Sequence, residues 1–151
     1  MQGDSRVEPS AGTFAALSAP VLPELAHPIF DEATFASVAS VVSPAAVSSY
    51  IKTLAERCDS LLRQLRVSPP LLADTRDLAA AAHALGGSAG LFGFQRLAIA
   101  AYNYERLLEI ASPSTPSAAV DLIAVMETSL FEMHQHLRRY DQATQGQSET
   151  T

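Results

Sequence analysis

Apolar residues recur along most of the chain at alternating spacings of three and four, which is the period of an amphipathic helix. Ser43-Pro44 is typical of an N-cap followed by proline at the first helical position, and Ser68-Pro69-Pro70 is typical of a helix end. Together they predict a helix at about 44–67. Its expected buried stripe is Val47, Ile51, Leu54, Cys58, Leu61 and Leu65.

Three further stripes follow, and they predict helices at about 74–90, 94–111 and 116–141. Asp74 is expected to be the N-cap of the first of these helices. The sequence SPSTPS at 112–117 separates the last two. The expected buried positions are Leu78, Ala82, Leu85 and Ala89, then Leu97, Ala101, Tyr104 and Leu108, and finally Ala119, Ile123, Met126, Leu130, Met133, Leu137 and Tyr140.

The predicted fold class is all-α, because no segment shows the alternation of a strand. Four amphipathic helices joined by short loops indicate an antiparallel four-helix bundle, with an extra short helix at about 31–42 covering one end. We expect residues 31–141 to form this domain. Residues 1–30 hold four of the nine prolines and are expected to be a flexible linker, and the polar tail at 142–151 is expected to be disordered.

Composition narrows the function classes. The chain has 151 residues, 48% of them hydrophobic, which suits one domain with one core. The net charge is −6, and one lysine with nine scattered arginines makes no basic patch, so nucleic acid is excluded as an expected partner. No apolar run approaches the ~20 residues that span a membrane. We see no export signal and expect a cytoplasmic protein.

Most of the side chains that could bind a metal or take part in catalysis have structural interpretations. The single cysteine, Cys58, excludes an internal disulfide, and its place on an apolar stripe predicts a core filler and not a reactive thiol. His134 and His136 point to different faces of a helix, and no Cys/His cluster accompanies them, so we expect no metal site. Tyr102 and Tyr104 are interpreted as core residues, as are the methionines of the last stripe.

The segment 81–94, AAHALGGSAGLFGF, departs from good helical sequence. Each interior glycine costs a helix roughly 1 kcal/mol relative to alanine, yet Gly86 and Gly87 are adjacent. His83 lies beside the buried stripe, so its imidazole should be exposed near the middle of the bundle's length. Its helical neighbours are small, apart from one arginine: Arg76, Ala79, Ala80, Gly86, Gly87 and Gly90. Such a surface allows close approach by another protein, and a neutral imidazole nitrogen is a nucleophile that can carry a phosphoryl group.

The residues HALGGSA at 83–89 resemble the signature of the histidine phosphotransfer (HPt) domain family, His-x-Leu-Lys-Gly-Ser-Ser/Ala. Gly90, Gly93, Leu97 and Leu108-Glu109 agree with the family's downstream pattern. The resemblance covers about residues 31–140. It implies a four-helix bundle whose second helix carries the phosphorylated histidine, with His83 as the phosphoacceptor and Nε2 as its reactive atom. Local support and docking are assigned to Ala79, Ala80, Gly86, Gly87, Ser88 and Gly90.

The resemblance also implies a role in two-component signalling. His83 would accept a phosphoryl group from a receiver-domain aspartate and pass it to a second receiver. The expected partners are response-regulator receivers or a hybrid sensor histidine kinase, and the domain is expected to be a monomer. It would need no cofactor of its own, because Mg²⁺ belongs to the receiver. GGSAG lacks the lysine and Ser/Thr of a phosphate-binding loop, so we expect neither an ATP site nor kinase activity.

One position departs from the family pattern. A lysine or arginine usually stands three residues after the histidine, and Gly86 stands there instead. A substitute cation could come from Arg76, two turns or roughly 10 Å away, or from Arg96 near the start of the next helix. The alternative function is a degenerate, HPt-like adaptor that docks a signalling partner without transferring phosphate.

Overall fold

The computed structural model describes residues 27–67 and 74–146. These ranges contain five helices and no strand, which confirms the all-α class. The bounds of α2 agree with the prediction at both ends, and those of α3 and α4 differ from it by one or two residues. The helices are α1 (Glu32–Ala39), α2 (Pro44–Val67), α3 (Thr75–Leu91), α4 (Gln95–Glu109) and α5 (Thr115–Gly146).

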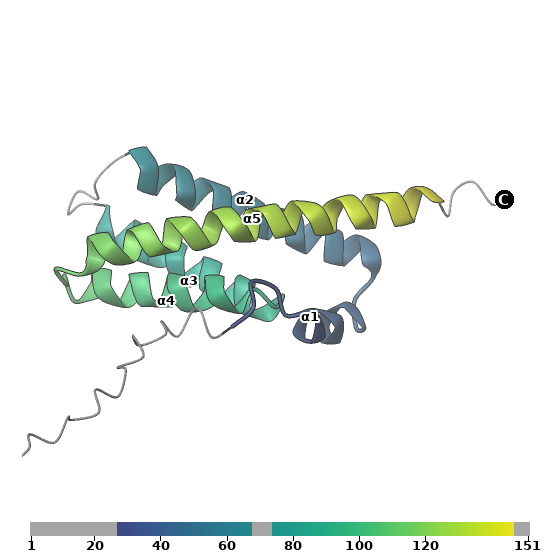
Figure 1. Cartoon of the computed structure of the whole chain (residues 1–151), viewed down its shortest axis with the longest axis horizontal. Coiled ribbons are helices and arrows are strands. Elements are labelled where there is room, and N and C mark those ends of the chain that lie inside the picture. Colours follow the sequence, from purple (N-terminus) through teal and green to yellow (C-terminus); the bar gives the residue numbers. More distant parts are fainter. Residues whose placement is uncertain (1–26, 68–73, 147–151) are drawn as a thin grey trace, which may run out of the picture.

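Helices α2 to α5 form the predicted antiparallel four-helix bundle, in which each helix runs opposite to the one before it (Figure 1). Helix α3 packs most extensively on α4, and α5 packs on both α2 and α4. Helix α1 lies at the end of the bundle where α3 turns into α4 (Figure 1). This arrangement leaves one side of the α3–α4 pair free of other helices in the part of the chain that the structure describes.

The apolar stripes meet in one core, but the buried face of α5 is rotated from the expected one. Met126 and Met133 are buried as predicted, whereas the other buried positions of α5 are Ala118, Leu122, Ser129 and His136. The expected positions Ala119, Ile123, Leu130, Leu137 and Tyr140 are only partly buried. The largest fully buried side chains of the core include Tyr104, Phe94, Ile51, Leu54, Leu61, Leu85, Leu97, Leu122, Met126 and Met133. Cys58 is also completely buried, and burial, with a smaller contribution from Asp59, raises the pKa of its thiol to about 12. A thiol in this environment stays protonated and unreactive, so its prediction as a core filler is confirmed.

The helix ends agree in part with expectation. Ser43 is the predicted N-cap of α2, since its Oγ accepts a hydrogen bond from the Ala46 N–H at 3.2 Å. Asp74 precedes α3, but its carboxylate makes no capping bond, because its backbone is already helical at φ −94° and ψ −7°. Helix α5 reaches Gly146 and not about 141, since no proline or earlier glycine follows Tyr140 to stop it. The first residues of the expected tail are therefore helical, and 147–151 lie outside the described residues.

The segment before α1 is attached to the bundle at its end. Phe30 packs its ring on Phe35, Phe94 and His136, with centroid distances of 5.2, 5.1 and 4.1 Å. The ring of Phe30 therefore lies in an apolar site of the bundle, and the flexible linker expected over residues 1–30 stays a prediction. Residues 1–26, the rest of that expected linker, lie outside the described residues.

The turn between α3 and α4 depends on Gly93. Its φ of +87° favours glycine, and a Cβ at this position would collide with the carbonyl oxygen of Asp31. The Asp31 N–H in turn donates a hydrogen bond to the Gly93 carbonyl at 2.7 Å. The close approach fixes the start of α1 against the turn, and the turn sets which residues of α3 and α4 face each other.

Candidate functional site

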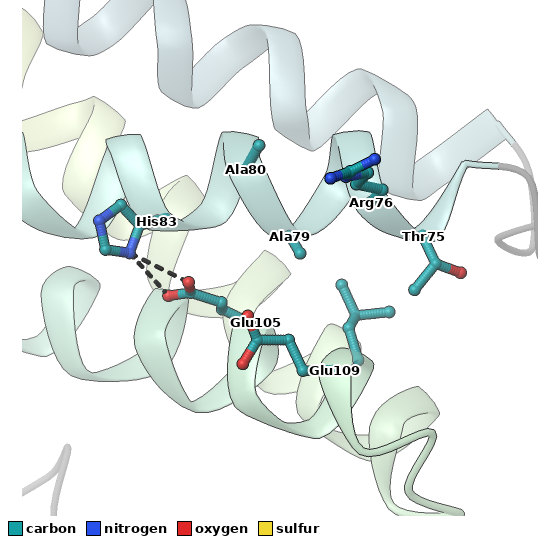
Figure 2. Close-up of a pocket in the computed structure, with 8 residues that line it drawn as sticks. Thr75, Arg76, Ala79, Ala80, His83, Glu105 and Glu109 are labelled. Carbon is teal, nitrogen blue, oxygen red and sulfur yellow. Dashed lines mark hydrogen bonds and ion pairs between the residues drawn. The ribbon is translucent and has the colours of Figure 1, made fainter.

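His83 lies at the middle of α3, on the side next to α4 (Figure 2). Leu78, Ala82, Leu85 and Ala89 are all buried on the neighbouring face of the helix. The His83 side chain is 68% exposed. The predicted exposure of the imidazole is therefore confirmed, and another molecule can reach the ring from solvent.

Glu105 on α4 holds one nitrogen of this imidazole. Its two carboxylate oxygens lie 3.0 and 3.1 Å from His83 Nδ1 (Figure 2). The Glu105 side chain is only 19% exposed, so the contact is sheltered on one side. An ionised carboxylate can only accept hydrogen bonds, so the Nδ1–H donates and carries the ring proton. Nε2 then keeps its lone pair and lies on the side of the ring away from Glu105 (Figure 2).

The contact between His83 and Glu105 follows from the helical hairpin. Both residues lie eleven positions from Phe94, one before it and one after it. Gly86 and Tyr102 each lie eight positions away, and Gly90 and Ala98 four, and both of these pairs are also in contact across the helices. Glu105 is not among the residues that the sequence pattern predicted. Counting outward from the turn would have found it, because antiparallel helices bring equidistant residues together.

A groove of about 700 Å³ runs from His83 along α3 and α4 (Figure 2). Ala79 and Ala80, both predicted as neighbours of the histidine, contribute to its lining, together with Glu105 and Glu109. Arg76 lines the groove at the opposite end from His83 (Figure 2), two helical turns or roughly 10 Å along α3. The immediate surroundings of the imidazole are therefore small and acidic.

Gly86 does not belong to the exposed surface. It is buried, and a Cβ placed there would lie 3.0–3.1 Å from three ring carbons of Tyr102. The expectation that both glycines form a bare surface is wrong for Gly86, because a neighbouring aromatic ring fills its space. Gly87 is exposed as expected.

Tyr102 is not a core residue, which corrects its interpretation from the sequence. It is 41% exposed, because it lies at the edge of the α3–α4 contact and not on the buried stripe. Its ring meets the imidazole of His83 edge-on, with a centroid distance of 5.8 Å and an interplanar angle of 64°. Tyr104, by contrast, is fully buried as predicted.

Two other predicted positions, Ser88 and Gly90, lie in contacts between α3 and its neighbouring helices. Ser88 Oγ donates to the Ala84 carbonyl at 3.0 Å and accepts from Arg57 Nη1 of α2 at 2.9 Å. Five residues after His83 on a helix, Ser88 lies about 140° around the axis and faces α2. Gly90 lies under Ala98, where a Cβ would be 3.5 Å from the alanine's, an ordinary contact, so the packing of α3 on α4 has room for a small side chain here.

Arg96 lies near the turn between α3 and α4, at the other end of α3 from Arg76. Its Nε donates a hydrogen bond to the carbonyl oxygen of His27. Of the two arginines predicted as substitute cations, only Arg76 lines the groove that contains His83.

In residues 27–67 and 74–146, no group of three or more His, Cys, Asp or Glu side chains is placed to hold a metal ion. His134 is exposed and His136 is buried, so the two histidines do lie on different faces of α5. None of the helices within these ranges is both long enough and apolar enough to cross a membrane.

The described residues thus form an antiparallel four-helix bundle with an exposed histidine at the middle of its second helix. The Hpt domain family model matches residues 45–145, about two thirds of the chain. The chain therefore belongs to the Hpt domain family, whose members carry phosphoryl groups in two-component signalling and interact with receiver domains and kinases. Comparison with curated proteins and with solved structures gave no match.

Proposed function

We propose that this domain is a phosphorelay intermediate that carries a phosphoryl group on Nε2 of His83 from one receiver domain to another. The observation that carries the proposal is the 3.0 Å contact between His83 Nδ1 and Glu105. It holds the ring proton on Nδ1 and leaves the Nε2 lone pair exposed to solvent. A nucleophile held in one tautomer, with its reactive atom outward, is what transfer between two proteins requires.

The transfer reaction begins with the Nε2 lone pair attacking the phosphorus of a receiver's aspartyl phosphate. An N–P bond forms, the P–O bond to the aspartate breaks, and its electron pair stays on the departing carboxylate. The proton remains on Nδ1, where Glu105 accepts its hydrogen bond and offsets the positive charge that develops on the ring. In the reverse reaction a second receiver's aspartate attacks the same phosphorus and the imidazole leaves.

The partner receiver supplies the Mg²⁺ and most of the charge that stabilises the transferring group in this proposal. The domain contributes the nucleophile, its orientation and a smooth surface for docking. Nothing in this division of work needs ATP, so the domain receives phosphate only from its partners. The monomeric state and the cytoplasmic location expected from the sequence stay predictions.

The test is incubation of the purified domain with a set of phosphorylated receiver domains. We expect acid-labile, base-stable phosphate on the domain, and a ³¹P spectrum that assigns it to Nε2. His83→Gln should abolish the label. His134→Gln, which removes an exposed histidine from α5, should leave it unchanged.

The adaptor hypothesis predicts a different outcome of the same experiment. It is favoured by Gly86, which stands where the family usually has a cation. If the native domain binds receivers, takes up no phosphate from any of them, and binds equally well as His83→Gln, then it is an adaptor. The proposed transfer function would then be wrong.

A further inference from the structure

Gly86 and Tyr102 form a matched pair. Three carbons of the Tyr102 ring lie 3.0–3.1 Å from the place where a Cβ at position 86 would stand. Contacts this short between a Cβ and another heavy atom are uncommon in proteins. Any side chain at 86 therefore requires the ring to move by a few tenths of an ångström. The missing cation at 86 and the large aromatic residue at 102 are therefore one structural feature.

The hydroxyl of Tyr102 lies beyond His83 in the direction of the α3 C-terminus. It is 3.5 Å from the place of a Cβ on Gly87, one helical turn after the histidine. The Nε2 of His83 points toward that same part of α3, away from Glu105 (Figure 2). The phenol and the reactive nitrogen therefore lie on the same side of the imidazole, with the two rings 5.8 Å apart.

The Tyr102 hydroxyl is also available for a new contact. The residue is 41% exposed, and within the described residues its hydroxyl makes no hydrogen bond. A phenol is a neutral donor that can reach an anionic oxygen without a counterion. Glu105 cannot serve the phosphoryl group in this way, because its carboxylate is an acceptor.

We propose that the hydroxyl of Tyr102 donates a hydrogen bond to an oxygen of the phosphoryl group on His83 Nε2. In this domain a neutral donor from α4 thus takes the place of a cation from α3. The inference rests on the proposed function for the identity of the ligand, but its geometry concerns this chain alone. Its consequence is a phosphohistidine held by a hydrogen bond that salt does not screen, whereas a lysine would hold it by a charge that salt does screen.

The experiment loads His83 with phosphoramidate, a small donor that needs no receiver. Nε2 attacks the phosphorus, the N–P bond of phosphoramidate breaks, and ammonia leaves. The phosphoryl group is then titrated by its ³¹P shift from slightly alkaline pH down into mild acid, because a protein-bound phosphate takes up its second proton near about pH 6. Freshly loaded native protein and freshly loaded Tyr102→Phe are compared, since phosphohistidine is acid-labile. A hydrogen bond to the dianion lowers the phosphoryl pKa, so Tyr102→Phe should raise it by roughly half a unit or more, at both low and high salt.

A second variant pair separates the hydroxyl from the ring. Gly86→Lys combined with Tyr102→Ala exchanges the tyrosine for a cation, and should again lower the phosphoryl pKa relative to Tyr102→Ala, but only at low salt. Tyr50→Phe is the matched control, since Tyr50 is an exposed tyrosine on α2, 51% accessible. Thermal unfolding of Tyr102→Phe should match native, because the ring that covers Gly86 is kept.

The outcomes of this experiment test the role of Tyr102 separately from the proposed transfer function. An unchanged titration in Tyr102→Phe overturns the inference, and so does an equal shift in Tyr50→Phe. If phosphoramidate loads His83 and Tyr102→Phe shifts the titration, the inference stands, even where no receiver transfers phosphate and the proposed function fails. If phosphoramidate does not modify His83, Nε2 is no free nucleophile, and both the inference and the proposed function are wrong.

Discussion

Glu105 contacts Nδ1 of His83, and in the proposed transfer this contact decides which nitrogen of the imidazole reacts. The carboxylate lies 3.0 Å from Nδ1 and is mostly sheltered, while the imidazole is mostly exposed. Glu109 follows one turn later on α4 and lines the same groove, but the hydrogen bond to His83 comes from Glu105. Two acids of the same charge in one groove therefore have different expected effects on transfer.

Removal of the Glu105 carboxylate should slow phosphoryl uptake. A hydrogen bond to a charged group contributes about 1.5–3 kcal/mol, and the exposure of the imidazole places this one at the low end. We expect Glu105→Ala to slow uptake from a phosphorylated receiver roughly tenfold. Glu105→Gln should cost only a few-fold, because the amide oxygen still accepts from the Nδ1–H.

Glu109→Gln is the control for this measurement. It removes a neighbouring negative charge from the groove without touching the imidazole. Initial rates of label transfer at saturating receiver would compare the three variants with native protein. Equal rates in Glu105→Ala and native protein would show that the tautomer is not set by this contact.

At the scale of elements, the segment before α1 and the C-terminal half of α5 depend on each other. Phe30 lies 4.1 Å from the ring of His136, and Phe35 lies 5.6 Å from it. His136 is buried at 7% exposure, and burial lowers its pKa below the ordinary value of 6.5. The charge of Arg139 lowers this pKa further, and those of Glu132 and Glu32 oppose the shift.

This buried histidine predicts that the fold is less stable in mild acid. The unfolded chain binds a proton on His136 at its ordinary pKa, and the folded chain binds it only at lower pH. The contribution of the neutral ring to the unfolding free energy is thus fully present above about pH 6.5. It is lost as the pH falls toward the lowered pKa of the folded state. Urea unfolding at pH 7.5 and pH 5 should therefore show a lower midpoint in acid.

Two histidine variants on α5 identify the source of this pH dependence. His136→Phe keeps an aromatic ring against Phe30 and cannot be protonated, so its midpoint should depend less on pH than that of native protein. His134→Gln, two residues away and exposed, should follow native protein. An equal pH dependence in His136→Phe and native protein would place the titrating group elsewhere.

At the scale of the whole molecule, the helices could be predicted from the sequence because apolar residues recur along each of them at the helical period. The match of α2 at both ends reflects local signals, a serine cap with proline at one end and Ser-Pro-Pro at the other. The overrun of α5 reflects the lack of such a signal before Gly146. The apolar pattern identified the buried faces of α2, α3 and α4, but in α5 several buried residues lie one position before the expected ones. Such a pattern establishes a helix end only where a cap or a proline is present.

The candidate site could be predicted from the sequence only where neighbouring residues of one helix indicate it. His83 stands out because small residues surround it within one helix. Glu105 and Tyr102 come from the other helix of the hairpin, so no residue near His83 in sequence points to them, and only the distance of each residue from the turn at Phe94 would have. Gly86 shows why the neighbouring surface was misjudged. A glycine leaves room either for solvent or for a side chain from elsewhere, and only the packing of α4 decides that Tyr102 takes it.

In the proposed transfer a receiver docks on the surface around His83, and Gly87 is the position where this docking can be measured. It is exposed on α3, and a Cβ there would lie 3.5 Å from the Tyr102 hydroxyl, an ordinary contact. Gly87→Ala should therefore stabilise the domain by up to ~1 kcal/mol, because alanine is the better helix former. The glycine is thus expected to serve docking and not folding.

A larger side chain at this position should separate the two roles. Gly87→Gln places a long polar group one turn from the imidazole, on the surface that a receiver must approach. We expect it to slow transfer at least tenfold, a loss of roughly 1.4 kcal/mol in the encounter with the receiver, while the urea midpoint stays at or above that of native protein. Ala124→Gln, at an exposed position of α5, is the control and should transfer as native protein does. Transfer by Gly87→Gln at the native rate would mean that the receiver approaches His83 from another side, and that the adjacent glycines serve only to admit Tyr102.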